Sequence, residues 1–154
     1  MRKLKNSELN RLDLETYKTV KKTPLIIILD NIRSLNNIGS VFRTSDAFLI
    51  EKIYLCGITA KPPHKDIHKT ALGSTDSVNW EYEKDTLVLV ETLKKEDVYI
   101  AAIEQAEQAI MLNDFNPVIG KKLALVFGNE VKGVSQDVVN ARDTVIYIPY
   151  FSNK

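Results

Sequence analysis

Apolar runs alternate along the chain with segments in which apolar positions recur at helical spacing. The runs are rich in Ile, Leu and Val and end at polar or turn residues, as strands buried on both faces of a sheet do. They predict strands at Pro24–Asp30, Ile53–Cys56, Val98–Ile103, Leu123–Phe127 and Val145–Ile148. The intervening segments predict helices at Asn37–Phe48, Asp66–Leu72, Asp85–Lys95 and Ser135–Ala141. This alternation predicts an α/β fold with a single doubly wound parallel sheet and helices on both faces.

Composition adds few constraints. The 154 residues carry a net charge of +1, but residues 1–22 hold an excess of Lys and Arg. This basic N-terminal arm could contact RNA phosphates or be a solvated helix. Cys56 is the single cysteine, so no internal disulfide is expected. No run approaches the roughly 20 apolar residues of a membrane span. We therefore expect a cytoplasmic location. His64 and His68 have the i, i+4 spacing of metal ligands but lack a third ligand, so we expect no metal site.

The first unusual segment, DNIRSLNNIGSVFRTSDAF at residues 30–48, leads from a predicted strand into a predicted helix. Asn36 or Asn37 is a suitable residue to cap that helix. Gly39 in the first turn suggests that another backbone or a ligand approaches closely. Arg43 interrupts apolar positions and so needs an acid or a phosphate as partner. Taken alone, the segment is equally compatible with a capped amphipathic helix bearing one surface arginine.

A second unusual loop follows the fourth predicted strand, in LALVFGNEVKGVS at residues 123–135. Gly128 and Gly133 flank Glu130 in a pattern that matches neither a phosphate loop nor GxGxxG. A cofactor without a phosphate chain would suit it better, and a tight turn with a solvated glutamate is the alternative. Ligands of doubly wound sheets bind beyond the carboxyl ends of strands, so we expect the two unusual segments to lie at that edge.

Together the two segments resemble the SpoU/TrmH-type RNA 2′-O-ribose methyltransferases of the SPOUT superfamily. The run Asn37-Ile-Gly-Ser-Val-Phe-Arg-Thr resembles the first family motif, N-x-G-x-x-x-R-T, and Gly128-Asn-Glu-Val-Lys-Gly resembles the second, G-x-E-x-x-G. The resemblance extends over residues 1–150 and implies a single methyltransferase domain at residues 1–154 with a C-terminal trefoil knot. It also implies S-adenosylmethionine as cofactor and a homodimer whose active sites use residues of both subunits. The implied substrate is structured RNA, either tRNA or rRNA.

The resemblance assigns roles to six residues at positions that match the family motifs. Three residues are implied to be catalytic and three to bind the cofactor: Asn37, Arg43 and Glu130, and Glu104, Gly128 and Ile148, respectively. Arginine is essentially never deprotonated in proteins, so we expect Arg43 to grip an RNA phosphate rather than to act as a base. The phosphate or Glu130 would take the proton of the ribose hydroxyl, and Asn37 would orient Arg43 or the ribose.

The chain departs from the family pattern near its end. Ile148-Pro149 matches the start of the third motif, but Tyr150-Phe151-Ser152 follows, and Lys154 stands about where Ser-Leu-Asn would begin. We therefore expect the knot to be incomplete in this sequence, through truncation or in a degenerate paralogue. A non-catalytic RNA-binding paralogue is one alternative function. A base methyltransferase from elsewhere in the superfamily is another, although the pairing of Asn37 with Arg43 favours ribose.

Overall fold

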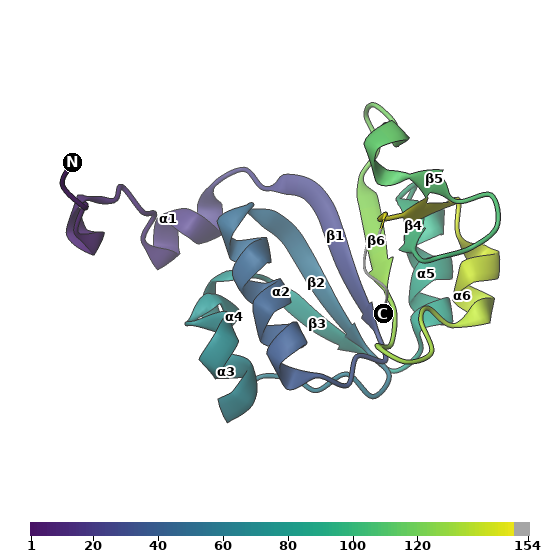
Figure 1. The fold of residues 1–154 in the computed structure, drawn as a ribbon, viewed down its shortest axis with the longest axis horizontal. Coiled ribbons are helices and arrows are strands. Elements are labelled where there is room, and N and C mark those ends of the chain that lie inside the picture. Colours follow the sequence, from purple (N-terminus) through teal and green to yellow (C-terminus); the bar gives the residue numbers. More distant parts are fainter. Residues whose placement is uncertain (150–154) are drawn as a thin grey trace.

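The computed structural model describes residues 1–149, which form one sheet of seven parallel strands (Figure 1). The strand order is β3-β2-β1-β6-β4-β7-β5. The strands are β1 (Thr23–Asp30), β2 (Ile50–Cys56), β3 (Trp80–Glu83), β4 (Tyr99–Ile103), β5 (Ile110–Met111), β6 (Leu123–Phe127) and β7 (Thr144–Tyr147). The predicted single parallel sheet is confirmed.

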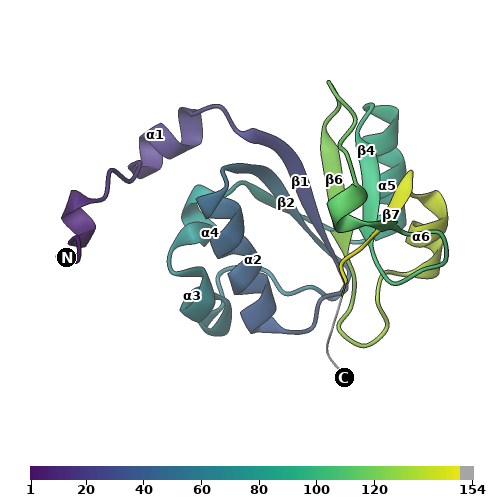
Figure 2. The same ribbon diagram turned by 45° about the horizontal axis from the view of Figure 1, so that its top comes forward.

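Helices cover both faces of this sheet, as predicted (Figures 1 and 2). Along β1, Ile26 and Ile28 pack in one core with α5 and α6, whereas Ile27 and Leu29 pack in a second core with α2 and α3. The period of two along a strand explains this division, because successive side chains point to opposite faces. The helices are α1 (Leu14–Thr19), α2 (Leu35–Ala47), α3 (Lys65–Ala71), α4 (Ser74–Ser77), α5 (Thr86–Lys95) and α6 (Gln136–Ala141), with 3₁₀ turns at Asn6–Glu8 and Leu112–Asp114.

The start of α2 differs from the prediction. Ser34 caps the helix, and its hydroxyl accepts a hydrogen bond of 3.2 Å from the Asn37 backbone N–H. The prediction that Asn36 or Asn37 is the cap is therefore wrong, because the last extended residue before the helix lies further upstream. As expected, another backbone approaches Gly39 closely: a Cβ there would lie 2.3 Å from the carbonyl oxygen of Ile67 in α3.

Hydrophobic patterning did not predict the two edge strands of the sheet. The β3 sequence, Trp-Glu-Tyr-Glu, alternates polar with aromatic residues, and β5 has two residues. An edge strand pairs on one side only, so it does not need a continuous apolar run. Ile148-Pro149, which match the start of the third motif, follow β7, whereas the expected departure from that motif at Tyr150-Phe151-Ser152 lies outside the described residues.

Candidate active site at the carboxyl edge of the sheet

The carboxyl ends of four neighbouring strands bring the unusual segments together. Leu29 of β1 pairs with Phe127 of β6, Phe127 pairs with Ile103 of β4, and Ile103 pairs with Ile146 of β7. The loops that follow these residues therefore leave the sheet side by side. The sequence-based expectation that both segments lie at this edge is confirmed.

Glu130, on the loop after β6, joins the loop after β1 through three hydrogen bonds. Its Oε2 accepts from the backbone N–H of Arg33 at 3.0 Å. Its Oε1 accepts from the backbone N–H of Ser34 at 3.0 Å and from Asn37 Nδ2 at 3.1 Å. The structure thus brings Asn37 and Glu130, one residue from each motif, into direct contact.

The environment of Glu130 favours its ionised form. Burial has the largest single effect and raises the pKa, but the hydrogen bonds from Arg33, Ser34 and Asn37 outweigh it and leave the pKa of Glu130 below its usual value. An efficient general base has a pKa near the working pH. Glu130 is therefore a weak base at neutral pH, and its contacts suit it to hold the two loops in place.

Asn129 closes the loop between Gly128 and Ser135. Its backbone exchanges two hydrogen bonds with Gly133, of 3.0 and 2.8 Å. Its side-chain Oδ1 accepts from the backbone N–H groups of Val131 at 2.9 Å and Lys132 at 3.1 Å, and its Nδ2 donates to the Asn31 carbonyl at 2.8 Å. The backbone around Glu130 is therefore folded back on itself and tied to the end of β1.

The three residues assigned to cofactor binding follow the neighbouring strands β4, β6 and β7. Both carboxylate oxygens of Glu104 accept backbone hydrogen bonds, from Val134 at 2.9 Å and from Gln105 at 2.8 Å. A Cβ on Gly128 would lie 2.0 Å from the backbone nitrogen of Val134, so this position requires glycine. Ile148, just beyond β7, is 42% exposed. Glu104 therefore supports the Gly128–Ser135 loop, and Ile148 offers an apolar surface beside it.

Asp30, which the sequence reasoning did not select, is the buried centre of this edge. The side chain is 1% exposed and accepts hydrogen bonds from Thr86 Oγ1 at 2.6 Å, Ser135 N at 2.9 Å and Asn31 Nδ2 at 2.9 Å. These contacts link β1 to the starts of α5 and α6. The sequence did contain a signal for Asp30, because it is an acid at the end of an apolar strand. A buried acid in such a position must find several hydrogen-bond donors.

Arg43 does not lie with the other two residues assigned to catalysis. It is six residues beyond Asn37 in α2, about 9 Å along the helix axis. It is exposed and lines a different cavity, of about 630 Å³, together with Arg11, Tyr17 and Leu72. Within residues 1–149 it forms no ion pair, so the acid partner considered from the sequence is not found there.

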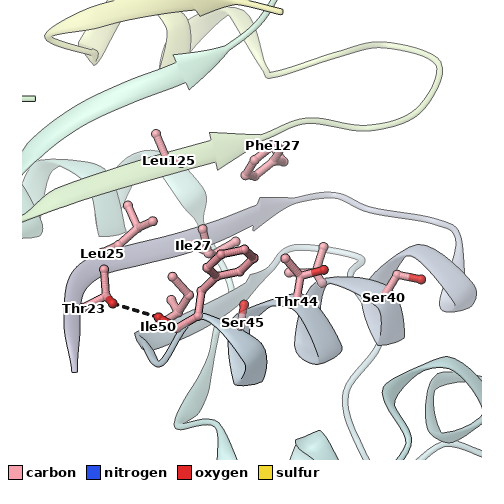
Figure 3. Close-up of a pocket in the computed structure, with 11 residues that line it drawn as sticks. Thr23, Leu25, Ile27, Ser40, Thr44, Ser45, Ile50, Leu125 and Phe127 are labelled. Atoms are coloured by element: carbon pink, nitrogen blue, oxygen red, sulfur yellow. Dashed lines mark hydrogen bonds between the residues drawn. The ribbon is translucent and has the colours of Figure 1, made fainter. Parts of the chain in front are cut away.

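An apolar groove of about 450 Å³ lies on the face of the sheet that carries α2 (Figure 3). Leu25 and Ile27 of β1, Leu125 and Phe127 of β6, and Phe48 after α2 line it. None of its lining residues is titratable, so the groove offers no acid or base. The carboxylates that bond to both motif loops lie instead at the carboxyl edge.

One of the two histidines considered for metal binding has a local role. His64 caps α3 and accepts a hydrogen bond of 3.2 Å at Nδ1 from the backbone N–H of Asp66. The described part of the chain contains no group of three or more His, Cys, Asp or Glu side chains that could hold a metal ion. Nor does it contain a helix that is long and apolar enough to cross a membrane.

The fold and the edge site define the class of the protein: an α/β domain whose polar residues gather at the carboxyl edge of one doubly wound parallel sheet. The model of the SpoU rRNA Methylase family matches residues 24–154, and the chain belongs to this family. The fold is also that of an AdoMet-bound rRNA methyltransferase from Sinorhizobium meliloti, with a TM-score of 0.78 and 20% identity over 89% of this chain and 52% of that one.

Two curated relatives are longer than this chain. A tRNA (guanosine(18)-2′-O)-methyltransferase of Borreliella burgdorferi is 25% identical over 90% of this chain and 62% of the relative. A 23S rRNA (guanosine-2′-O-)-methyltransferase, RlmB, of Blochmanniella floridana is 27% identical over 82% of this chain and 48% of the relative. The chain thus spans about half to three-fifths of the length of these relatives.

Proposed function

We propose that this chain is an S-adenosylmethionine-dependent methyltransferase that acts on a ribose 2′-hydroxyl of tRNA or rRNA. The contact between Asn37 and Glu130 carries the proposal, because it joins the two family motifs at the edge where doubly wound sheets bind ligands. The names of the two curated relatives support both the reaction and the RNA substrate. A protein that modifies these RNAs works where they are, and we propose a cytoplasmic location.

The residues beyond β4, β6 and β7 fit S-adenosylmethionine. The N–H groups of the closed Gly128–Ser135 loop are largely bonded within the protein, so the loop would offer backbone carbonyl groups to the cofactor. The half-exposed Ile148 offers an apolar surface for an adenosine ring. Glu104 would hold this loop in shape through its bond to Val134. When bound, the cofactor supplies a methyl group on a sulfonium, which is transferred to the ribose oxygen.

The chain itself contributes mainly positioning. In favourable cases, correct alignment of reacting groups supplies about 7–11 kcal/mol of a reaction barrier. Glu130 fixes the side chain of Asn37, which then orients the ribose next to the Gly128–Ser135 loop. Because the pKa of Glu130 is lowered, the proton of the 2′-hydroxyl passes more readily to an RNA phosphate than to this carboxylate.

We propose that Arg43 serves the active site of a second copy in a homodimer. The separation of Arg43 from Glu130 within one chain supports this assignment, since each subunit then offers its arginine to a partner. A guanidinium so placed would bind the phosphate next to the target ribose and stabilise developing negative charge. The apolar groove lined by Leu125 and Phe127 is a further surface that a partner subunit could cover.

We also propose that the end of the domain forms the trefoil knot. The support is the position of β7, which lies between β4 and β5 rather than at the edge of the sheet. A last strand inserted there requires the chain to pass close to the segment that connects β4 to β5. Limited proteolysis within residues 104–109 would test it, because cutting a loop that encloses the chain end destabilises β7 more than cutting an open loop does.

Two measurements test the proposed activity. Calorimetric titration measures S-adenosylmethionine binding, and mass spectrometry of nuclease-digested tRNA and rRNA identifies 2′-O-methylated nucleosides. Binding and ribose methylation support the proposal. RNA binding without either indicates a non-catalytic RNA-binding protein, and methylation on a base indicates another branch of the superfamily.

The dimer assignment has its own test. Chains carrying Arg43→Ala and Glu130→Gln are each expected to lose most of their activity. Mixing them should restore methylation only if a mixed dimer combines the intact Glu130 of one chain with the intact Arg43 of the other. Each chain is first shown to be dimeric by ultracentrifugation. Inactivity of a mixed dimer that forms in normal yield would place Arg43 in the site of its own chain.

A further inference from the structure

A third cavity lies between residues that flank the contact of Asn37 with Glu130, and it shares the Gly128–Ser135 loop with the proposed cofactor site. It measures about 510 Å³ and opens between the loops that follow β1, β2 and β6. Two cationic side chains line it, Arg33 from the loop after β1 and Lys132 from the loop after β6. The remaining lining residues are Asp30, Asn31, Ile58, Asn129, Val131, Gly133 and Ser135.

The backbone of both cationic residues is held in place by hydrogen bonds to Glu130 and Asn129. The backbone N–H of Arg33 donates to Glu130 Oε2 at 3.0 Å, and that of Lys132 donates to Asn129 Oδ1 at 3.1 Å. Within residues 1–149, neither side chain takes part in an ion pair. The fold therefore presents two cationic side chains at one opening, and neither is paired directly with an acid.

The acids near this cavity are already engaged. Asp30 and Glu130 each accept three hydrogen bonds, so their oxygens are occupied by donors of the protein. Ile58 and Val131 line the cavity and are 67% and 77% exposed, respectively. Two free cations beside exposed apolar side chains suit a ligand with a negatively charged backbone and apolar faces, as a strand of RNA has.

We propose that Arg33 and Lys132 bind the sugar–phosphate backbone of the RNA beside the target ribose, and that the cavity between them receives a neighbouring nucleotide. The inference rests on the proposed function and assigns the RNA a path over the loops after β1 and β6. The planar guanidinium of Arg33 binds a phosphate through two parallel hydrogen bonds, and Lys132 acts as a point charge. Contacts to phosphates position a nucleic acid without reading its sequence, so the two residues act on any RNA substrate.

The test is the salt dependence of RNA binding by the full chain. The variants Arg33→Gln and Lys132→Gln keep the backbone N–H groups that bond Glu130 and Asn129, so the loops retain their ties. The control is Lys95→Gln, the same charge change at an exposed residue in the last turn of α5. Fluorescence anisotropy with an unmodified tRNA transcript at several salt concentrations measures the slope of log affinity against log salt.

Each site variant is expected to lower the magnitude of that slope by about 0.7 to 1, the effect of losing one phosphate contact. The control is expected to leave the slope unchanged, and Arg33→Lys should recover the slope but not the full affinity. Circular dichroism should match that of the unaltered chain in every variant.

The results separate this inference from the proposed function. Slopes unchanged in both site variants, in a chain that methylates RNA, would overturn the phosphate contacts and leave the function standing. Reduced slopes in a chain that binds RNA but transfers no methyl group would support the contacts and overturn the function. No RNA binding by the unaltered chain would overturn both.

Discussion

The side-chain amide of Asn37 donates a hydrogen bond of 3.1 Å to Oε1 of Glu130, across 93 positions of the sequence. The same carboxylate accepts the backbone N–H groups of Arg33 and Ser34, the cap of α2. Glu130, on the loop after β6, therefore fixes the start of α2. Any role of Asn37 in the reaction depends on Glu130.

Replacement of Asn37 by alanine removes this contact. We expect kcat/KM for RNA methylation to fall by about 10- to 100-fold, because small displacements of a positioning group are costly to a reaction. The matched control is Asn36→Ala, at the neighbouring exposed position, which should change kcat/KM by no more than about twofold. Equal losses in both variants would show that the contact has no role in the reaction.

The pKa of Glu130 predicts how stability depends on pH. Because its pKa is lowered in the folded chain, the ionised carboxylate stabilises the fold at every pH above the unfolded value of about 4.3. This contribution is lost as the pH falls through the folded pKa. Urea unfolding measures the difference in the free energy of unfolding between the unaltered chain and Glu130→Gln. This difference should be constant from about pH 5 to about pH 7, because both pH values lie above the unfolded pKa. The difference should shrink below about pH 4. A difference that persists at low pH would show that the ionised carboxylate is not its source.

Hydrophobic patterning predicted the interior of the fold well. The buried strands β1, β4 and β6 must be apolar on both faces, and each of them is therefore a continuous apolar run in the sequence. The meeting of Asn37 and Glu130 also followed from a general rule, because the carboxyl ends of parallel strands share one edge. Buried strands, and the edge of the sheet at which their loops meet, can therefore be predicted from the sequence alone.

The features that the sequence did not predict depend on contacts between residues that are far apart in the sequence and form no recognisable pattern. The role of Asp30 requires donors from Thr86 and Ser135, which are remote in sequence. The separation of Arg43 from Glu130 depends on the exposed side of α2 that Arg43 occupies, where it lines a cavity together with Tyr17 of α1. Arg33 was overlooked because it follows a strand by only three residues, where one cation in a polar loop has no distinctive pattern.

Gly39 offers a test of the packing between α2 and α3. In Gly39→Ala, the new Cβ would lie 2.0 Å from Thr70 Oγ1 and 2.3 Å from the Ile67 carbonyl oxygen, so the helices must move apart. We expect the free energy of unfolding to fall by about 1–3 kcal/mol, even though alanine is a better helix former than glycine. Ser40→Ala, at the next and exposed position, is the control and should stay within about 0.5 kcal/mol of the unaltered chain. A stabilised Gly39→Ala variant would mean that the helices pack less closely than the structure indicates.

Asp30 offers a test of the buried network beneath the Gly128–Ser135 loop. In Asp30→Asn, the amide oxygen can still accept from Thr86, but the amide NH₂ cannot accept from the backbone N–H of Ser135. Leaving a buried donor unpaired costs about 1–3 kcal/mol, and we expect the free energy of unfolding to fall by that amount. Asp76→Asn, at an exposed position, removes the same charge and should have an effect below about 0.5 kcal/mol.

The Asp30 network also makes a local prediction that a general loss of stability would not. Because Ser135 ends the loop that carries Glu130, its amide should exchange with solvent faster in Asp30→Asn, while amides in the core of β2 keep their relative protection. Hydrogen exchange followed by NMR measures both in one experiment. Uniformly faster exchange across β2 and Ser135 would show that Asp30 supports the whole sheet rather than positioning the loop.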